Sequence, residues 1–424
     1  MATPTITDVS STEILDNRLE PTLRVTVRTE SSVGRADVPR GRSRGENEVN
    51  EIRDGTQRYR GNGVRSAVRQ INDVVRPALR DTPVIDQRNI DRTLVRLDGE
   101  GPATIIGGNS TTGVSLAVAK AAAAAVDQPL YRYIGGVRHD RLPVPFLDVI
   151  EGGELGASGL AFQEHQIVPV AAESFSAAIR YGAETYYELG DILETKYGKP
   201  ACAVGDEGGY CPASIDDAWE AFDVIMSAIE AAGHTDRIAL AADVAASHLY
   251  DTASEEYRLD DGLYTREQLF DYYADLLETF PIVSLEDPLV ETDFQGTARM
   301  TDRFDCQIVG DDLFVTDSNR VRTGLEFGAG TALLLKVNQV GTVTGAIEAA
   351  NVAREGGLRV QVSERSGQTA DTWLADLAVG LGARQIKTGV TRSERTEQYN
   401  RLMAIERELG PSAEFGDPSL TEMI

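Results

Sequence analysis

Short apolar runs recur along the second half of the chain, and each closes on a polar or ionisable residue. These runs end at Asp243, Glu286, Asp311, Lys336, Ser363 and Lys387. From the second of these residues to the last, the intervals are 25, 25, 27 and 24 residues. One strand, one helix and two loops fill such an interval. Functional groups at the carboxyl ends of successive parallel strands build the active site of a (β/α) barrel. The spacing therefore predicts a barrel rather than a series of unrelated buried strands.

The length of 424 residues exceeds what one hydrophobic core usually covers, so two domains are expected. The first third lacks the 25-residue rhythm and alternates apolar and polar residues over 23–29, which predicts a sheet. Glycines, prolines and charges gather at residues 135–145. We therefore expect an α+β domain at residues 1–135 and a (β/α)₈ barrel at residues 136–424. Within the barrel, a helix is predicted at 172–198 and a strand at 201–205.

The net charge is -26, and only five of the 41 basic residues are lysines. An acidic surface that keeps arginine and avoids lysine suits a protein that works at high salt, where screening removes the self-repulsion. An ordinary acidic cytosolic protein is the alternative. Such a charge argues against nucleic-acid binding, which needs clustered basic residues. Because lysine is scarce, Lys336 and Lys387 at strand ends are expected to serve chemistry.

Cysteine usage and hydropathy exclude further classes of protein. The three cysteines lack CxxC spacing, so neither a disulfide framework nor a zinc ribbon is indicated. No apolar run reaches the length of a membrane span, and no signal segment opens the chain. We therefore expect a soluble cytoplasmic protein.

Three of the strand-end residues are carboxylates: Asp243, Glu286 and Asp311. Converging at one barrel mouth, they would suit a hard divalent cation, and Mg²⁺ takes few protein ligands. The alternative role is ion pairing with arginines. Lys336 would be the base, its pKa lowered by burial and by nearby cations. This set fits abstraction of a proton next to a carboxylate, whose ene-diolate product needs metal charge.

Several blocks of the sequence carry a resemblance to a known family. They are Gly205-Asp-Glu-Gly-Gly209, Leu285-Glu-Asp-Pro288, Val309-Gly-Asp-Asp312, Leu334-Leu-Lys-Val-Asn-Gln339 and Ile386-Lys-Thr-Gly389 with Arg392-Ser-Glu-Arg395. Together they resemble the signature blocks of enolase, the glycolytic phosphopyruvate hydratase, and the resemblance covers nearly the whole chain. It implies an α+β domain capping a barrel, Mg²⁺-dependent dehydration of 2-phospho-D-glycerate to phosphoenolpyruvate, and a homo-oligomer, either a dimer or an octamer.

The resemblance also implies a role for individual residues. Asp243, Glu286 and Asp311 would bind the first Mg²⁺, with Glu286 and Asp311 also near the substrate. Lys336 would take the C2 proton. Glu207 would be the acid for the leaving hydroxyl, supported by Glu164. The remaining substrate contacts would be Arg365 and Ser366 to phosphate and Lys387 to the carboxylate.

The chain departs from the family pattern inside the expected active site. Arg40 stands where the family loop has a serine, and Leu155 and Glu364 replace two histidines. In the family that serine coordinates a second Mg²⁺, so the inserted arginines of the loop 40–44 are candidates either to pair with Glu364 or to replace the charge of this missing ion. Two alternatives to the enolase reaction therefore stay open. One is a paralogue that dehydrates or enolises another carboxylate, and the other is an inactive binding protein on the same scaffold.

Overall fold

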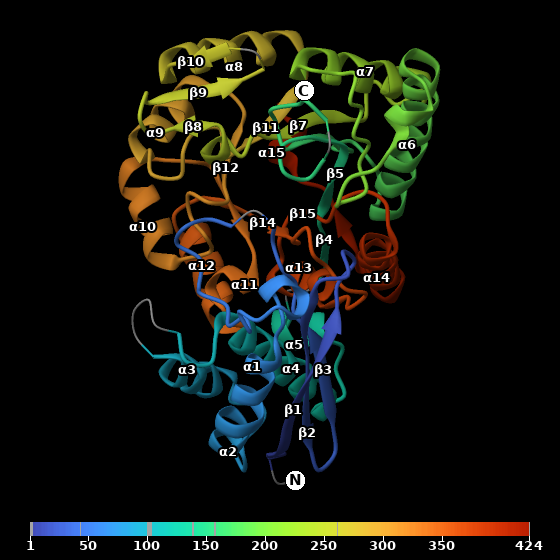
Figure 1. The fold of residues 1–424 in the computed structure, drawn as a ribbon. Helices are drawn as coiled ribbons and strands as arrows, with labels where there is room; N and C mark the ends of the chain where they lie inside the picture. The colour runs from blue at the N-terminus through green and yellow to red at the C-terminus, as the bar shows by residue number, and fades with distance from the viewer. Residues whose placement is uncertain are drawn as a thin grey trace.

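The computed structural model describes residues 3–423 apart from 43, 100–103, 138–139, 157 and 261. Its first part is an antiparallel sheet with the order β1-β2-β3 and a group of helices. The strands are β1 (Ile6–Leu15), β2 (Pro21–Thr29) and β3 (Val33–Asp37). The helices are α1 (Arg65–Gln70), a π-helical segment (Ile71–Val75), α2 (Arg76–Leu79), α3 (Gln87–Asp98), α4 (Gly108–Ala125) and α5 (Leu130–Gly135). Figure 1 shows these elements together below a larger barrel.

The small domain is held together by its central helix. Most of α4 is buried, and this alanine-rich helix packs on β2 and β3. Small side chains allow a close approach, because a Cβ at Gly34 of β3 would lie 2.1 Å from the carbonyl oxygen of Ala117. The alternating pattern of residues 23–29 is confirmed as a half-buried strand, β2.

The larger part is a closed eight-stranded barrel with the order β11-β12-β13-β14-β15-β5-β6-β7. Its strands are β5 (Val144–Glu151), β6 (Glu164–Val168), β7 (Ala239–Asp243), β11 (Ile282–Glu286), β12 (Gln307–Gly310), β13 (Ala332–Leu335), β14 (Arg359–Ser363) and β15 (Gln385–Lys387). The long outer helices are α6 (Phe175–Tyr197), α7 (Ala218–Ala231), α8 (Arg266–Thr279), α9 (Phe294–Arg303), α10 (Ser318–Phe327), α12 (Val343–Glu355), α13 (Trp373–Leu381) and α14 (Ser393–Leu409). The predicted barrel is confirmed.

Shorter elements complete the barrel domain. They are β4 (Arg141–Leu142), β8 (Tyr250–Asp251), β9 (Glu256–Leu259), β10 (Gly262–Tyr264), α11 (Val337–Val340), β16 (Glu414–Phe415) and α15 (Pro418–Thr421). The helix expected at 172–198 is confirmed as α6. The strand expected at 201–205 is wrong, because Lys199–Cys202 form a 3₁₀ turn with Pro200 as its second residue. No helix in the described part of the chain is long and apolar enough to cross a membrane.

One strand runs against the others. β6 pairs antiparallel with both β5 and β7, whereas the other barrel pairs are parallel. The first residue of β6, Glu164, therefore lies beside the last residues of its neighbours, Glu151 and Asp243. Since β6 ends at the far side of the barrel, where β7 begins, two helices, α6 and α7, connect them instead of one.

The alternation along β6 gives His165 a fully buried place outside the barrel. Its ring stacks on Phe162 and meets Phe222 of α7, with centroids 5.7 and 5.0 Å apart. Burial lowers the pKa of His165 to about 3, so the folded protein resists a proton that the unfolded chain takes up near pH 6.5. Stability from this residue is complete above pH 6.5 and is lost as the pH falls toward 3.

We therefore expect the stability advantage of the wild type over His165→Leu to shrink by about 2 kcal/mol between pH 7 and pH 5. Urea unfolding at both pH values measures this difference. His248→Leu, at a partly exposed histidine, is the matched control. If the stability difference between the wild type and His165→Leu is the same at both pH values, the pKa of His165 is the same in the folded and unfolded states, which would contradict this prediction.

Candidate active site

The polar residues predicted at strand ends lie around one mouth of the barrel. Asp243, Glu286, Ser363 and Lys387 are the last residues of their strands, and Asp311 and Lys336 directly follow theirs. The strand pairing places Glu286 beside Asp243, and Lys387 beside Ser363. Glu164 joins them because β6 starts at this end. Residues far apart in the sequence thus converge through the closure of the barrel.

Lys387 links three buried carboxylates at this mouth. Its Nζ lies 2.9 Å from Glu164 Oε2, 3.2 Å from Asp243 Oδ2 and 2.8 Å from Glu286 Oε2. Burial opposes its charge, but the carboxylates outweigh burial and raise the pKa of Lys387 well above its ordinary value. Lys387 is therefore a fixed positive charge. Its contact with a substrate carboxylate stays a prediction.

Lys336 reaches the same mouth from the end of β13. Its Nζ lies 2.5 Å from Asp311 Oδ2, and Gln339 Nε2 donates to Asp311 Oδ1 at 2.7 Å. Burial disfavours the ammonium, yet the ion pair with Asp311 prevails and raises the pKa of Lys336. The expected lowering of this pKa is therefore wrong for the protein alone. The charge of Asp311 stabilises the Lys336 ammonium. A cation bound to Asp311 would neutralise that charge and so lower the pKa of Lys336.

The residues predicted to bind metal fit a divalent cation by their chemistry. Glu286 Oε1 is buried without a hydrogen-bond partner among the described residues. Burial, followed by the charge of Asp243, raises the pKa of Glu286 well above its ordinary value. When all three are ionised, Glu164, Asp243 and Glu286 carry three negative charges against the one charge of Lys387. An uncompensated buried carboxylate oxygen of this kind is a ligand for a hard cation.

Two other groups of carboxylates are more compact. In each, one oxygen per residue lies within 4.8 Å of the others. One group contains Asp287, Asp311 and Asp312, and the other contains Asp148, Glu207 and Glu364. Asp287 is already engaged, because its two oxygens accept the backbone N–H groups of Asp311 and Asp312 at 3.0 and 2.7 Å. Its role is to shape the turn after β12.

Glu207 lies in a tight turn beside the mouth, and only 5% of its surface is exposed. Val204 and Tyr210 pair across this turn, and Gly208 adopts a φ of +96° that favours glycine. Glu151 fixes the turn by accepting the backbone N–H groups of Glu207 and Gly209 at 3.2 and 2.5 Å. The backbone at Glu207 is thereby fixed beside the mouth of the barrel.

Glu164, the predicted helper of Glu207, bonds Lys387 and also accepts from Gln166 Nε2 at 2.9 Å. Burial raises the pKa of Glu164 to about 7, although Lys387 opposes the rise. A carboxyl with this pKa can exchange a proton near neutral pH. The structure thus gives Glu164 an environment suited to acid–base work.

Arg365 and Ser366, the predicted phosphate ligands, contact the small domain. The two terminal nitrogens of Arg365 each lie 3.0 Å from a carboxylate oxygen of Glu48. Ser366 Oγ accepts from the backbone N–H of Arg42 at 2.8 Å and from Arg18 Nη1 at 3.1 Å. Both residues therefore join the loops of the small domain to the barrel mouth. Their contact with phosphate stays a prediction.

Comparison with known families supports what the geometry suggests. The family model for the enolase N-terminal domain matches residues 6–134, and that for the enolase C-terminal TIM barrel domain matches residues 139–423. The chain belongs to the enolase family. The predictions of this family, of its fold and of an enzyme are confirmed.

Curated relatives named enolase match over nearly their full length. The enolase of Methanopyrus kandleri is 52% identical, with 97% of this chain and 98% of the relative covered. The enolase of Pyrococcus furiosus is 48% identical, with 95% of each chain covered. That of Methanocaldococcus jannaschii is 46% identical, with 97% of each covered.

The three departures from the enolase pattern take up distinct positions. Arg40 pairs with Glu20 and donates to Asn62 Oδ1 at 3.2 Å. Leu155 is buried. Glu364 forms an ion pair with Arg395. The expectation that the inserted arginines pair with Glu364 is therefore wrong, because a buried arginine from α14 takes that role. The loop arginines have other partners: Arg40 pairs with Glu20, Arg42 with Asp206 and Arg44 with Glu48.

Sequence reasoning missed several polar residues of this enolase site. Asp148 and Glu151 are fully buried carboxylates within the apolar strand β5. They carried the same signal as Lys336, an ionisable residue in a buried strand. Arg395 lay within a quoted family block but received no role. Nothing local in the sequence indicates that it meets Glu364, 31 positions earlier.

Proposed function

We propose that this enolase-family protein catalyses the reversible dehydration of 2-phospho-D-glycerate to phosphoenolpyruvate in glycolysis and gluconeogenesis, with Mg²⁺ as cofactor. The observation that carries the proposal is the placement of Lys336 beside the strand-end carboxylates at the barrel mouth. The curated relatives named enolase support it over the two alternatives, a paralogue for another acid and an inactive protein.

Asp243, Glu286 and Asp311 would hold the Mg²⁺, which supplies positive charge to the substrate carboxylate as negative charge develops on it. Lys336 takes the C2 proton once its ammonium has lost a proton. Lys387 adds a second, permanent positive charge beside the same carboxylates. Proton removal is favoured because two kinds of positive charge meet the developing anion.

Glu207 donates a proton to the leaving C3 hydroxyl, and Glu164 supports it. Arg365 and Ser366 hold the phosphate, which orients C2 toward Lys336. Since Arg365 is paired with Glu48, phosphate binding would exchange one anionic partner for another. The guanidinium geometry suits both partners, because it meets carboxylate and phosphate in a bidentate manner.

Turnover by purified protein in molar KCl tests this proposal. With Mg²⁺ and 2-phosphoglycerate, we expect formation of phosphoenolpyruvate, followed by its absorbance. A chelator such as EDTA should abolish the activity, and added Mg²⁺ should restore it. Folded, metal-loaded protein without turnover would indicate a different substrate, and the altered positions Arg40, Leu155 and Glu364 would be the first to examine.

Further properties remain predictions from the sequence. These are a cytoplasmic location, a homo-oligomeric state and adaptation to high salt. The domain limits 1–135 and 136–424 are proposed to hold, since α5 ends at Gly135 and the barrel domain begins with β4 at Arg141. The family-model matches end and begin at residues 134 and 139, which supports this division.

A further inference from the structure

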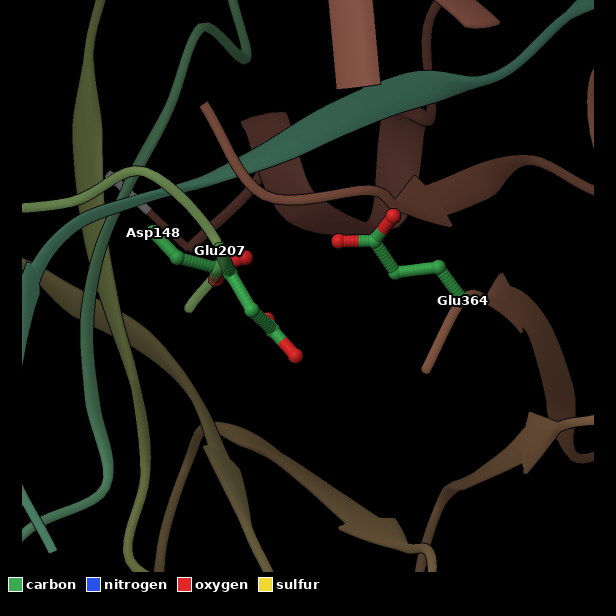
Figure 2. A group of neighbouring side chains, drawn as sticks. All are labelled: Asp148, Glu207 and Glu364. Carbon is green, nitrogen blue, oxygen red and sulfur yellow. The ribbon is translucent and has the colours of Figure 1, made fainter. Parts of the chain in front are cut away.

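Asp148, Glu207 and Glu364 form a compact carboxylate cluster outside the predicted metal set. They come from β5, from the turn 205–209 and from the segment after β14. One oxygen of each lies within 4.8 Å of the others. Figure 2 shows Glu364 extending toward the side on which Asp148 and Glu207 lie. All three side chains are at least nine-tenths buried.

The cluster holds carboxylate oxygens that the protein leaves unpaired. Among the described residues, Asp148 Oδ2, Glu207 Oε2 and Glu364 Oε1 are buried without hydrogen-bond partners. This distinguishes the cluster from the group around Asp287, whose oxygens accept backbone N–H groups. A buried carboxylate oxygen without a donor is unfavourable unless a proton or a cation occupies it.

The charge balance around the cluster favours a divalent cation. The cluster has three carboxylates and one positively charged partner, Arg395. The guanidinium of Arg395 pairs with Glu364 Oε2, and Glu364 Oε1 keeps no hydrogen-bond partner among the described residues. The remaining charge is two negative units when all three carboxyls are ionised. Lys387 is engaged by Glu164, Asp243 and Glu286. A single divalent ion would neutralise the excess.

The dimensions of the cluster also suit such an ion. Opposite oxygens around Mg²⁺ or Ca²⁺ lie about 4–5 Å apart, twice the metal–oxygen distance. One wall is Gly389, with a φ of +71°. A Cβ at this position would lie 2.9 Å from Glu364 Oε1 and 2.4 Å from the carbonyl oxygen of Glu207. The absence of a side chain there keeps the cluster compact.

From this geometry we infer that Asp148, Glu207 and Glu364 form a second divalent-cation site in the substrate-free protein. The site is separate from the set Asp243, Glu286 and Asp311. It explains why the chain places an acid at Glu364 next to another acid. The inference concerns binding in the absence of substrate, and its test does not use activity, so it stands apart from the proposed reaction.

Mn²⁺ binding to the full chain in molar KCl tests the inference. Equilibrium dialysis followed by electron paramagnetic resonance counts the bound ions. We expect two Mn²⁺ per wild-type chain and one in Asp148→Asn, in Glu364→Gln and in Asp243→Asn. Loss of outer-shell partners alone weakens metal sites about 10–100-fold, so loss of a direct ligand should weaken the second site by about 100-fold or more.

Asp91→Asn is the matched control, because Asp91 is a buried aspartate in α3 of the small domain, and it should retain two ions. Circular dichroism establishes that each variant is folded. Anomalous diffraction from Mn²⁺-soaked wild-type crystals provides a measurement without substitutions, with a peak expected between the three carboxylates.

A single wild-type ion that disappears only in Asp243→Asn would overturn the inference and leave the proposed Mg²⁺ site intact. The three carboxyls would then share protons. A single ion that survives in Asp243→Asn but disappears in Asp148→Asn would support the cluster and contradict the predicted metal set. Binding of no ion would contradict both.

Discussion

Lys336→Ala is expected to lower kcat for the dehydration of 2-phosphoglycerate about 10²–10⁴-fold, the usual range for loss of a general base. No other lysine in the described part of the chain reaches Asp311, so no neighbour would replace it. The measurement is steady-state turnover at saturating Mg²⁺ in molar KCl.

The control for this experiment is Lys199→Ala, which removes an exposed lysine directly after α6 and should keep wild-type turnover. A folded Lys336→Ala protein with near-wild-type kcat would contradict the assignment of the base. Exchange of the C2 proton with solvent gives a second readout. We expect it to disappear together with turnover, because Lys336 handles this proton.

Arg395→Met is expected to reduce the free energy of unfolding by about 3–5 kcal/mol, the range for breaking a buried ion pair by removing one partner. The guanidinium is fully buried, pairs with Glu364, and donates to the carbonyl oxygens of Arg365 and Ser366 at 2.8 Å each. Methionine fills part of the volume but leaves the Glu364 carboxylate and the Arg365 carbonyl without the arginine, whereas the Ser366 carbonyl keeps a donor in Asn17 at 3.2 Å. Denaturant unfolding in molar KCl measures the loss.

Two further variants show whether the ion pair causes this loss. Glu364→Gln combined with Arg395→Met should be more stable than Arg395→Met alone, since the isolated charge has been removed. Arg322→Met, at a half-exposed arginine, should change stability by less than about 0.5 kcal/mol. If Arg395→Met and Arg322→Met behave alike, the buried pair does not contribute in the way that its geometry suggests.

The regular spacing of polar residues at the ends of apolar runs was sufficient to predict the barrel fold. Residues such as Glu286 and Lys387 stand out in the sequence because an apolar run gives no reason for a charge at its end. The reversed direction of β6 could not be predicted in this way. An apolar run looks the same whichever way the strand points, and the direction follows from closure of the barrel and from the pair of helices α6 and α7.

The sequence predicted the residue types of the site better than it predicted their charge states and ion-pair partners. The state of Lys336 depends on its 2.5 Å contact with Asp311, and the partner of Glu364 is an arginine from another helix. Both are consequences of tertiary packing. Motif comparison showed that Glu364 replaces a histidine, but only the structure shows that it joins Asp148 and Glu207.

The scarcity of lysine has a practical consequence for chemical modification. Of the five lysines, Lys336 and Lys387 are buried in ion pairs, and Lys120 is paired with Asp371 at 2.6 Å. The most accessible amines are those of Lys196, which is half exposed although it pairs with Glu220, and of Lys199, which is exposed directly after α6. Amine-directed dyes, cross-linkers or surface coupling would therefore attach the molecule mainly at one place and in one orientation.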